Sequence, residues 1–292
     1  MLAPDFSHFR PFSRLVPPAG AATLFRVKHE PSFLPLERRT LQKYKLLAGL
    51  IVIAAVTVAH AQTKISSIDQ RTSGWFSCDG CAGANANGTS STYWMKTPVS
   101  SPSMDGKAAE FFLGGSTPYS NALWSQKLVG DGTKISGMHH FVNDIYFYYT
   151  NSTAAQGFEF NISQYIGGKG YIYGAQCNIR SGAGPHWDIS VPKDYSKPLT
   201  LTNMKWQNTG VYCKPPTYKW NHVTLEFYRT SDNKVKFVSI TLNGSKHYIN
   251  VTVPARIAPS DWKGLNTHFQ MNGNYRQDDY KAWVDRWAVT YW

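Results

Sequence analysis

The sequence predicts an all-β, antiparallel fold, and three observations support this prediction. First, residues 144–149, 157–163 and 171–178 alternate apolar and polar side chains with a period of two, which is typical of strands buried on one face. Second, turn signals of Gly, Asn and Asp separate many short strand-like runs. Third, no long segment outside the apolar run of residues 46–59 has the 3.6-residue period of a helix. Such a chain forms a sandwich, a barrel or a jelly roll.

The first 61 residues are expected to be absent from the mature protein. Four basic residues between positions 38 and 45 precede an apolar run over 46–59, and Ala59-His60-Ala61 follows. This is the pattern of a secretory signal peptide, so we expect a secreted, extracellular or periplasmic protein. The run is shorter than the roughly 20 residues of a spanning helix, which argues against a membrane anchor. Residues 1–36 are interpreted as the result of a wrongly assigned start codon, with a longer cytoplasmic tail as the alternative.

The charge of the remaining residues is moderate. Residues 62–292 carry 22 basic and 15 acidic side chains, a net charge of +7 against +12 for the whole chain. This excess favours acidic partners such as uronate-containing polysaccharides, although solubility alone also explains it. No basic run is present, so we expect no nucleic-acid binding. We expect a monomer with one sizeable β domain or two small ones, and no membrane span after signal cleavage.

All four cysteines lie in the exported part, where disulfides are stable. We expect the pairs Cys78–Cys81 and Cys177–Cys213, because Asp-Gly between the first two permits a tight turn. A redox C-x-x-C motif would open a helix, whereas a Gly- and Asn-rich loop follows here. A four-cysteine zinc site would show a second close pair, and Cys177 and Cys213 are far apart.

Residues 62–100 have few apolar anchors and are expected to form an irregular N-terminal segment fixed by a disulfide. A β domain is expected over 101–292. Its predicted strands are 108–113, 122–128, 141–150, 157–163, 170–178, 186–191, 221–229, 235–242, 246–252, 265–272 and 282–291. Asn243-Gly244 predicts a type I′ hairpin, and Ser260 could cap a short helix over 259–262.

The alternating strands suggest a carbohydrate-binding surface. The polar face of the second and third segments would carry Glu159 with Asn161, then Gln176 with Asn178, and the first segment offers Tyr146. Sugars present hydroxyl groups and flat C–H faces, which amides, carboxylates and aromatic rings bind. Two tryptophans in loop-like contexts are candidates for stacking on pyranose rings, and a Cys177–Cys213 disulfide would hold the connection that contains both. These are Trp187 and Trp206.

Three phrases give residues 100–292 a resemblance to a known superfamily: Ser103-Met104-Asp105-Gly106-Lys107, Trp220-Asn221-His222-Val223 with Leu242-Asn243-Gly244, and Trp283-Val284-Asp285-Arg286-Trp287. They resemble the concanavalin A-like lectin/glucanase superfamily, which includes the laminin G-like jelly rolls. The resemblance implies a two-sheet antiparallel β-sandwich (jelly roll). It also implies that Asp285 could help to hold a structural calcium ion, although we expect no other cofactor.

Enzymatic activity is the alternative hypothesis. A retaining glycosidase needs two carboxyl groups about 5–5.5 Å apart, and the mature chain has only the glutamates Glu110, Glu159 and Glu226. The E-x-D-x-x-E motif of the glucanases is absent. If the protein is a hydrolase, Glu159 is the principal carboxylate. Glu226 is expected instead to pair with Lys236 or Lys246 across a hairpin.

A polysaccharide lyase is the weaker form of that alternative. Alginate-lyase relatives of the jelly roll carry a Q-(I/V)-H strand, whereas Gln176-Cys177-Asn178 lacks the histidine and His268-Phe269-Gln270 has the reversed order. Neighbouring histidines such as His139-His140 would point to opposite faces of a strand and could not chelate a metal together. We therefore expect a lectin-like polysaccharide-binding protein first, a glycan-degrading enzyme second, and a structural or adhesion module third.

Overall fold

The structure is a computed structural model that describes residues 61–79, 91–115, 118–130, 132–151, 153–276 and 278–292. The chain divides into two units, and the first, Met1–Val56, lies outside the described residues. The predicted signal sequence up to His60 and the predicted disulfide partner Cys81 also lie outside them. The described fold belongs to the second unit, Thr57–Trp292.

Most of the described residues form short strands, together with one 3₁₀-helical turn and one α-helical turn. The turns are η1 (Ile68–Gln70) and α1 (Gly132–Ile135). The strands are β1 (Thr63–Ile65), β2 (Trp75–Asp79), β3 (Ser91–Val99), β4 (Ala108–Gly115), β5 (Asn121–Val129), β6 (His140–Tyr149), β7 (Ala155–Ile166), β8 (Lys169–Tyr173), β9 (Ala175–Asn178), β10 (His186–Pro192), β11 (Met204–Tyr212), β12 (Asn221–Arg229), β13 (Lys234–Leu242), β14 (Ser245–Pro254), β15 (Arg256–Ile257), β16 (Gly264–Gly273) and β17 (Tyr280–Tyr291).

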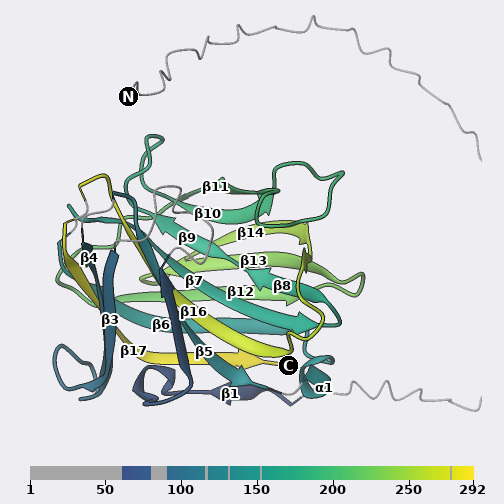
Figure 1. Cartoon of the computed structure of the whole chain (residues 1–292), viewed down its shortest axis with the longest axis horizontal. Coiled ribbons are helices and arrows are strands. Elements are labelled where there is room, and N and C mark those ends of the chain that lie inside the picture. Colours follow the sequence, from purple (N-terminus) through teal and green to yellow (C-terminus); the bar gives the residue numbers. More distant parts are fainter. Residues whose placement is uncertain (1–60, 80–90, 116–117, 131, 152, 277) are drawn as a thin grey trace, which may run out of the picture. The chain divides into compact units, whose positions relative to one another are not determined.

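The strands build two sheets. Sheet A has the order β14-β13-β12-β6-β17-β4-β3, with β1 on β17. Sheet B has the order β11-β10-β9-β7-β16-β5-β2, and β8 pairs with β7 and β15. Figure 1 labels most of these strands, and the two sheets overlap in its view. The pairings between these described strands are antiparallel. The predicted all-β, two-sheet antiparallel sandwich is therefore confirmed.

Aromatic rings fill the space between the sheets. The ring of Phe147 in sheet A lies 5.3 Å from that of Phe158 in sheet B, and Phe111 lies 4.9 Å from Phe269. The alternation predicted for β6 and β7 places Phe147 and Phe158 inwards, and it places polar residues such as Asp144 and Glu159 on the outer faces. Burial of such large apolar surfaces is the main stabilising contribution to a sandwich of this size.

The prediction of an irregular segment over 62–100 was wrong for the parts of it that the structure describes, residues 62–79 and 91–100. Strands β1 and β3 lie in sheet A and β2 lies in sheet B, so this segment belongs to the same sandwich as residues 101–292. Ser, Thr and Gly weaken the period-two signal of these strands, and pairing with an existing sheet overrides their low propensity. The helix expected over 259–262 is a turn, in which the Trp262 N–H donates to the Pro259 carbonyl over 3.1 Å.

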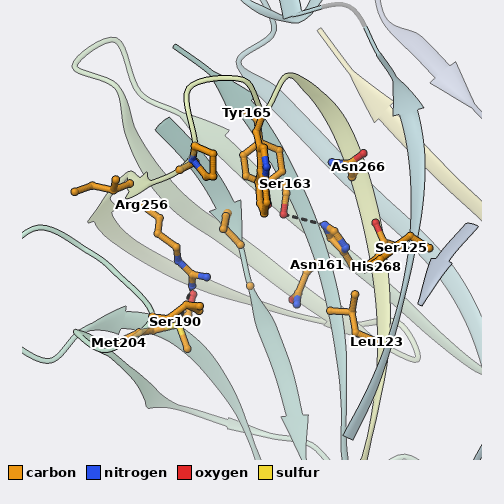
Figure 2. A pocket seen from close by; sticks show the side chains of 18 of the residues that line it. Leu123, Ser125, Asn161, Ser163, Tyr165, Ser190, Met204, Arg256, Asn266 and His268 are labelled. Atoms are coloured by element: carbon orange, nitrogen blue, oxygen red, sulfur yellow. Dashed lines mark hydrogen bonds between the residues drawn. The ribbon is translucent and has the colours of Figure 1, made fainter. Parts of the chain in front are cut away.

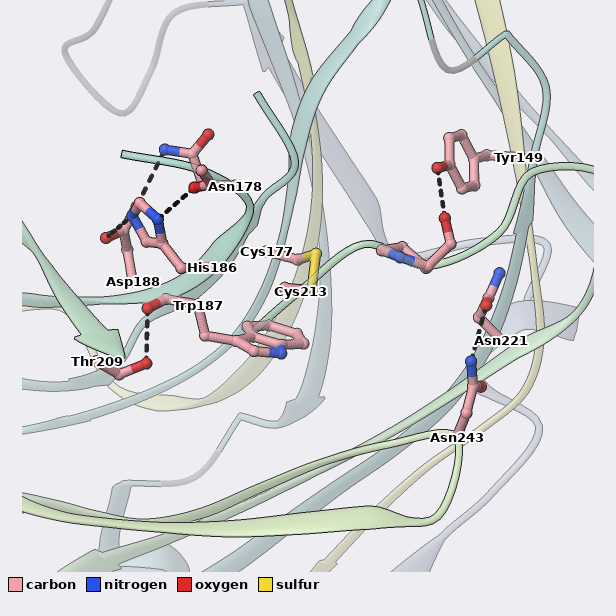
Figure 3. The surroundings of a disulfide bond; sticks show 12 residues. Tyr149, Cys177, Asn178, His186, Trp187, Asp188, Thr209, Cys213, Asn221 and Asn243 are labelled. Atoms are coloured by element: carbon pink, nitrogen blue, oxygen red, sulfur yellow. Dashed lines mark hydrogen bonds and ion pairs between the residues drawn. A yellow bond between two sulfur atoms is a disulfide. The ribbon is translucent and has the colours of Figure 1, made fainter. Parts of the chain in front are cut away.

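Two local predictions are confirmed by the structure. Asn243 and Gly244 have φ values of 49° and 86°, the left-handed conformations that a type I′ hairpin requires, and they connect β13 to β14. Cys177 and Cys213 form a disulfide, shown in Figure 3. Cys78 is also disulfide-bonded. Among the described residues, no helix has the length and apolar character needed to cross a membrane.

Candidate functional site

A groove of about 1040 Å³ hollows the outer face of sheet B. Its floor is formed by side chains of β7, β10 and β16, and its rim by edge strands and loops. The floor residues are Glu159, Asn161, Ser163, Ser190 and His268, and the apolar rim residues are Phe76, Leu201, Trp206, Ile257 and Trp262. Figure 2 shows part of the lining.

Strand alternation explains why the floor is polar. On β7 the side chains of Phe158, Phe160 and Ile162 are buried in the core, so the intervening residues point to the other face of the sheet. Strand β16 lies beside β7 with Asn161 opposite His268, which places the outward residues of both strands next to one another. The sequence pattern thus sets a row of hydrogen-bonding groups across the middle of sheet B.

Glu159 is the acidic group of the floor, and its side chain is surrounded by amides. Its Oε2 accepts from Asn161 Nδ2 over 3.1 Å, and its Oε1 accepts from Gln270 Nε2 and from Asn272 Nδ2. Burial raises the pKa of Glu159 to about 7, an effect that these amide donors and Arg256 partly oppose. The residue is 5% exposed. Glu159 therefore exchanges a proton near neutral pH and already has hydrogen-bond partners for both oxygens.

A second group of polar side chains lies beside Glu159. The His268 Nε2 is 2.9 Å from the Ser163 hydroxyl, and burial lowers the pKa of His268 to about 4, so the ring is neutral at pH 7. Its buried Nδ1 has no hydrogen-bond partner among the described residues. Burial also raises the pKa of Tyr165, with Ser163 and Arg256 acting in the opposite direction. These side chains can exchange protons or hydrogen bonds with a ligand.

Arg256 is a cation of the groove lining whose charge acts on Glu159. It comes from the two-residue strand β15, and Figure 2 shows its side chain reaching towards Ser190 and Met204. Its Nη2 lies 2.8 Å from the Met204 thioether sulfur, and its buried Nε has no hydrogen-bond partner in the described part of the chain. Burial lowers the pKa of Arg256 from its ordinary value, while Tyr165 and Glu159 oppose this effect.

The structure brings only some of the predicted binding residues together. Glu159, Asn161 and Trp206 line the groove. Gln176 lies opposite Glu159 in the sheet, and Asn178 donates to Asp188 over 3.2 Å, so both are on sheet B but outside the groove lining.

Tyr146 and Trp187 lie elsewhere. Tyr146 belongs to sheet A, where its ring stacks on His222 with centroids 4.1 Å apart, so it does not share a surface with Glu159. Trp187 is fully buried beside Phe160, as expected of a core ring, and cannot stack on a ligand. Figure 3 shows it next to the disulfide.

Several lining residues were missed by sequence reasoning. Tyr165 continues the alternation of Glu159, Asn161 and Ser163 along β7, so the same signal could have identified it. Arg256 and Trp262 lie on a two-residue strand and a turn, where no periodic pattern exists. Only the three-dimensional arrangement places them in the groove.

Two buried carboxylates, Asp69 of η1 and Asp285 of β17, form a second polar cluster. The Asp285 Oδ2 accepts from the Ser103 hydroxyl over 2.8 Å and from the Met104 N–H, and the Asp69 Oδ1 accepts from the Trp287 N–H. The other oxygen of each carboxylate is buried without a partner among the described residues. Burial raises the pKa of Asp69 to about 7. Carboxylate oxygens are the ligand type that calcium prefers, but no group of three or more His, Cys, Asp or Glu could hold a metal within the described ranges.

Comparisons with known proteins give similarity to solved structures alone, since no protein-family model and no curated protein matches the chain. A cellulose-induced protein, Cip1, is 12% identical, with a TM-score of 0.45, covering 77% of this chain and 96% of that one. Lectin I from Ulex europaeus, in complex with the methyl glycoside of α-L-fucose, is 13% identical, with a TM-score of 0.42 and coverages of 75% and 98%. A carbohydrate esterase from the Shiga toxin-encoding bacteriophage phi24B is 12% identical, with a TM-score of 0.41 and coverages of 79% and 99%.

Lectins are thus among the similar solved structures. The two sheets of this chain define its fold, and side chains on sheet B form the candidate site. The chain is an antiparallel β-sandwich with a polar-floored, aromatic-rimmed groove across one outer face.

Proposed function

We propose that this protein binds a polysaccharide in the groove of sheet B. The observation that supports this proposal is the combination of a hydrogen-bonding floor with exposed aromatic rings in one cavity. Its volume of about 1040 Å³ is at the upper end of the roughly 300–1,000 Å³ usual for small-molecule sites, which leaves room for more than one sugar residue.

The rim provides the rings that a sugar needs. Trp262 is 50% exposed and Phe76 is 62% exposed, and Trp206 is partly exposed on β11. Large aromatic rings are costly to leave in water, and the flat C–H face of a pyranose covers such a ring well. Asn161, Ser163 and Ser190 would then bind the hydroxyl groups.

Affinity electrophoresis through gels that contain neutral or acidic polysaccharides tests the proposal. We expect retardation of the wild type by at least one polysaccharide, and its loss in Trp206→Ala and Trp262→Ala. Trp94→Ala is the matched control, because Trp94 is a partly exposed ring stacked on Phe112 in sheet A. Retardation by none of the polysaccharides, or equal loss in the control, would refute the proposal.

The same proposal includes secretion. The Cys177–Cys213 disulfide suits an oxidising compartment, and the apolar run that precedes Ala61 supports export. Expression of the full chain with a C-terminal tag, followed by N-terminal sequencing of the exported protein, tests this. We expect the mature chain to begin at Gln62, and retention of the uncleaved chain in the cytoplasm would contradict it.

A glycan-degrading enzyme, either a hydrolase or a lyase, is the second candidate. Glu159 is contacted by amides, and Asp188 lies two strands away, roughly 10 Å by strand spacing. This separation of the backbones exceeds the about 5–5.5 Å between the carboxyl groups of a retaining pair and is closer to the about 6.5–9.5 Å of an inverting pair. Asp188 is also occupied by His186, whose Nε2 lies 3.0 Å from its Oδ1.

Lyase chemistry would use groups that the groove does bring together. His268 and Tyr165, which both line the groove, are the candidate base and acid of a β-elimination, although burial lowers the pKa of His268 to about 4 and so weakens it as a base. Release of unsaturated uronates by the wild type but not by Tyr165→Phe would establish the lyase. Release of reducing ends without unsaturation, abolished in Glu159→Gln, would establish the hydrolase. No product from a broad set of glycans would leave binding as the function.

A further inference from the structure

Arg256 is a groove residue whose guanidinium has no ion-pair partner among the described residues, although the charge of Glu159 acts on it from a greater distance. No carboxylate of the described residues lies within ion-pairing distance of its guanidinium, although such pairs occur at six other places in the same part of the chain. The hydrogen-bond partner of its Nη2 is the Met204 sulfur, a weak acceptor. We infer that the groove selects an acidic polysaccharide and that a uronate carboxylate of the ligand pairs with Arg256. This inference rests on the proposed function.

Burial makes the missing partner significant. Arg256 is half-buried, and a cation that is partly removed from water without a counter-ion destabilises the folded state. An acidic side chain beside Arg256 would offset this destabilisation. However, both carboxylate oxygens of the groove acid Glu159 already accept hydrogen bonds from amides. The arrangement is therefore explained better by a ligand that supplies the negative charge than by stability of the empty fold.

Arg229 shows what an arginine with a structural role looks like in this protein. It is 4% exposed, and its Nη2 contacts the Ser136 carbonyl and the His139 Nε2. Its guanidinium also lies over the Tyr171 ring, 5.1 Å from the centroid. The guanidinium of Arg229 thus binds protein groups that connect three segments. Arg256 lacks such a set of partners and lines a cavity instead.

The rest of the groove has the charge that an acidic glycan requires. Lys127 and Lys263 line it together with Arg256, whereas the described lining carries two acids, Glu159 and Asp261. Glu159 is partly protonated near pH 7 because burial raises its pKa to about 7. The cations therefore outweigh the anions in the groove, which favours a polyanion.

Gly174 keeps the floor open for that ligand. A Cβ at this position would lie 3.0 Å from the Ser190 hydroxyl and 3.6 Å from the Asn161 Oδ1, so a side chain here would occupy the space above both. Figure 2 shows Arg256 reaching towards Ser190. A sugar residue at this place could thus present its carboxylate to Arg256 and its hydroxyl groups to Ser190 and Asn161.

The test compares polygalacturonate with its methyl ester and with dextran sulfate, by affinity electrophoresis and isothermal titration calorimetry of residues 62–292 with both disulfides intact. We expect polygalacturonate to bind and its methyl ester to bind about 10- to 100-fold more weakly, the usual value of a hydrogen bond to a charged group. Arg256→Gln should lower polygalacturonate affinity by the same factor, and Arg256→Lys by less, because lysine keeps the charge without the planar fork.

The control variant is Arg276→Gln, which removes an exposed arginine that does not line the groove. It should bind polygalacturonate as the wild type does. Equal affinity for the acid and its ester, or for Arg256→Gln and the wild type, would overturn the inference while glycan binding stands. Binding of dextran sulfate in preference to the uronate would overturn the carboxylate assignment. Binding of no neutral or acidic polymer would instead refute the proposed function.

Discussion

At the scale of single residues, Glu159 shows what a sequence pattern can and cannot predict. The alternation along 157–163 correctly places Glu159 and Asn161 on the same face, opposite Phe158 and Phe160. It gives no information on depth, because burial of Glu159 depends on Gln270 and Asn272 from β16, far away in the sequence. The raised pKa of Glu159 follows from this packing and could not be predicted from the chain alone.

We predict that Glu159 makes the folded state less stable as the pH rises. Its folded pKa of about 7 exceeds the ordinary value of 4.5, so between these two pH values the folded state holds a proton that the unfolded state has lost. Stability therefore falls over this window, by at most about 3 kcal/mol. Urea unfolding at pH 4.5 and pH 8 should show Glu159→Gln gaining stability relative to the wild type at the higher pH.

Glu226→Gln is the control for this measurement. Glu226 lies in sheet A, where its Oε2 is 3.1 Å from Lys246 Nζ on the surface, as the sequence predicts for one of the two expected lysines. Its substitution should change stability little at either pH. A stability difference between Glu159→Gln and the wild type that stays constant from pH 4.5 to pH 8 would contradict the pKa assignment.

At the scale of elements, the strands with a strong period-two pattern were predicted and those without it were not. Strands β12, β13 and β14 agree with prediction to within a few residues. Strands β2, β3 and β11 were missed, because they contain Ser, Thr, Gly or Asn and pair at or near the edges of the sheets. The run predicted as one strand over 170–178 is divided at Gly174 into β8 and β9. In these cases pairing with neighbouring strands in the folded sheet, and not the local sequence pattern, determines where a strand forms or ends.

We predict that the Cys177–Cys213 disulfide stabilises the domain strongly. It connects β9 to the end of β11 across a separation of 36 residues, and closing a loop of that length is worth about 4 kcal/mol in the chain-entropy model. Denaturant unfolding of the double variant Cys177→Ser/Cys213→Ser should show a loss of this order. A loss below about 1 kcal/mol would mean that hydrogen bonds such as that from the Thr209 hydroxyl to the Trp187 carbonyl already fix this region.

We also predict that calcium binds at the buried carboxylates that connect η1 to β17. The free oxygens of Asp69 and Asp285 would accept the ion, with the remaining ligands from backbone carbonyls or water. Calcium added to protein treated with a chelator should raise the melting temperature of the wild type by several degrees and leave Asp285→Asn unchanged. Asp232→Asn, at an exposed ion pair with Lys234, should respond as the wild type does. An unchanged wild type would exclude the site.

At the scale of the whole domain, the sequence predicts the sandwich but not the composition of its faces. Strands β6 and β7 follow one another in the chain, yet they lie in different sheets. Tyr146 on β6 therefore faces away from Glu159 on β7, on the opposite outer surface of the sandwich. Alternation shows which residues of one strand lie on the same face of its sheet. The connections between the two sheets determine which strands lie in the same sheet.

The groove depends on the same large-scale arrangement. Its floor comes from the middle of sheet B and its rim from β2, β11 and the turn that contains Trp262, segments that are distant in sequence. Trp206 and Trp262 could each be recognised as aromatic, but only the fold brings them to one cavity with Arg256. The proposed function consequently rests on the assembled sheet and not on a local motif.

Hydrogen–deuterium exchange with and without saturating oligogalacturonate tests the central claim, that the groove of sheet B binds an acidic glycan, most directly. We predict slower exchange in residues 200–206 and 257–263, which line the groove, with sheet A strands β3 and β4 unchanged. At a concentration that just saturates the wild type, the protection should be much smaller in Arg256→Gln. Protection confined to the outer face of sheet A, or the same protection of the groove in Arg256→Gln, would contradict the account.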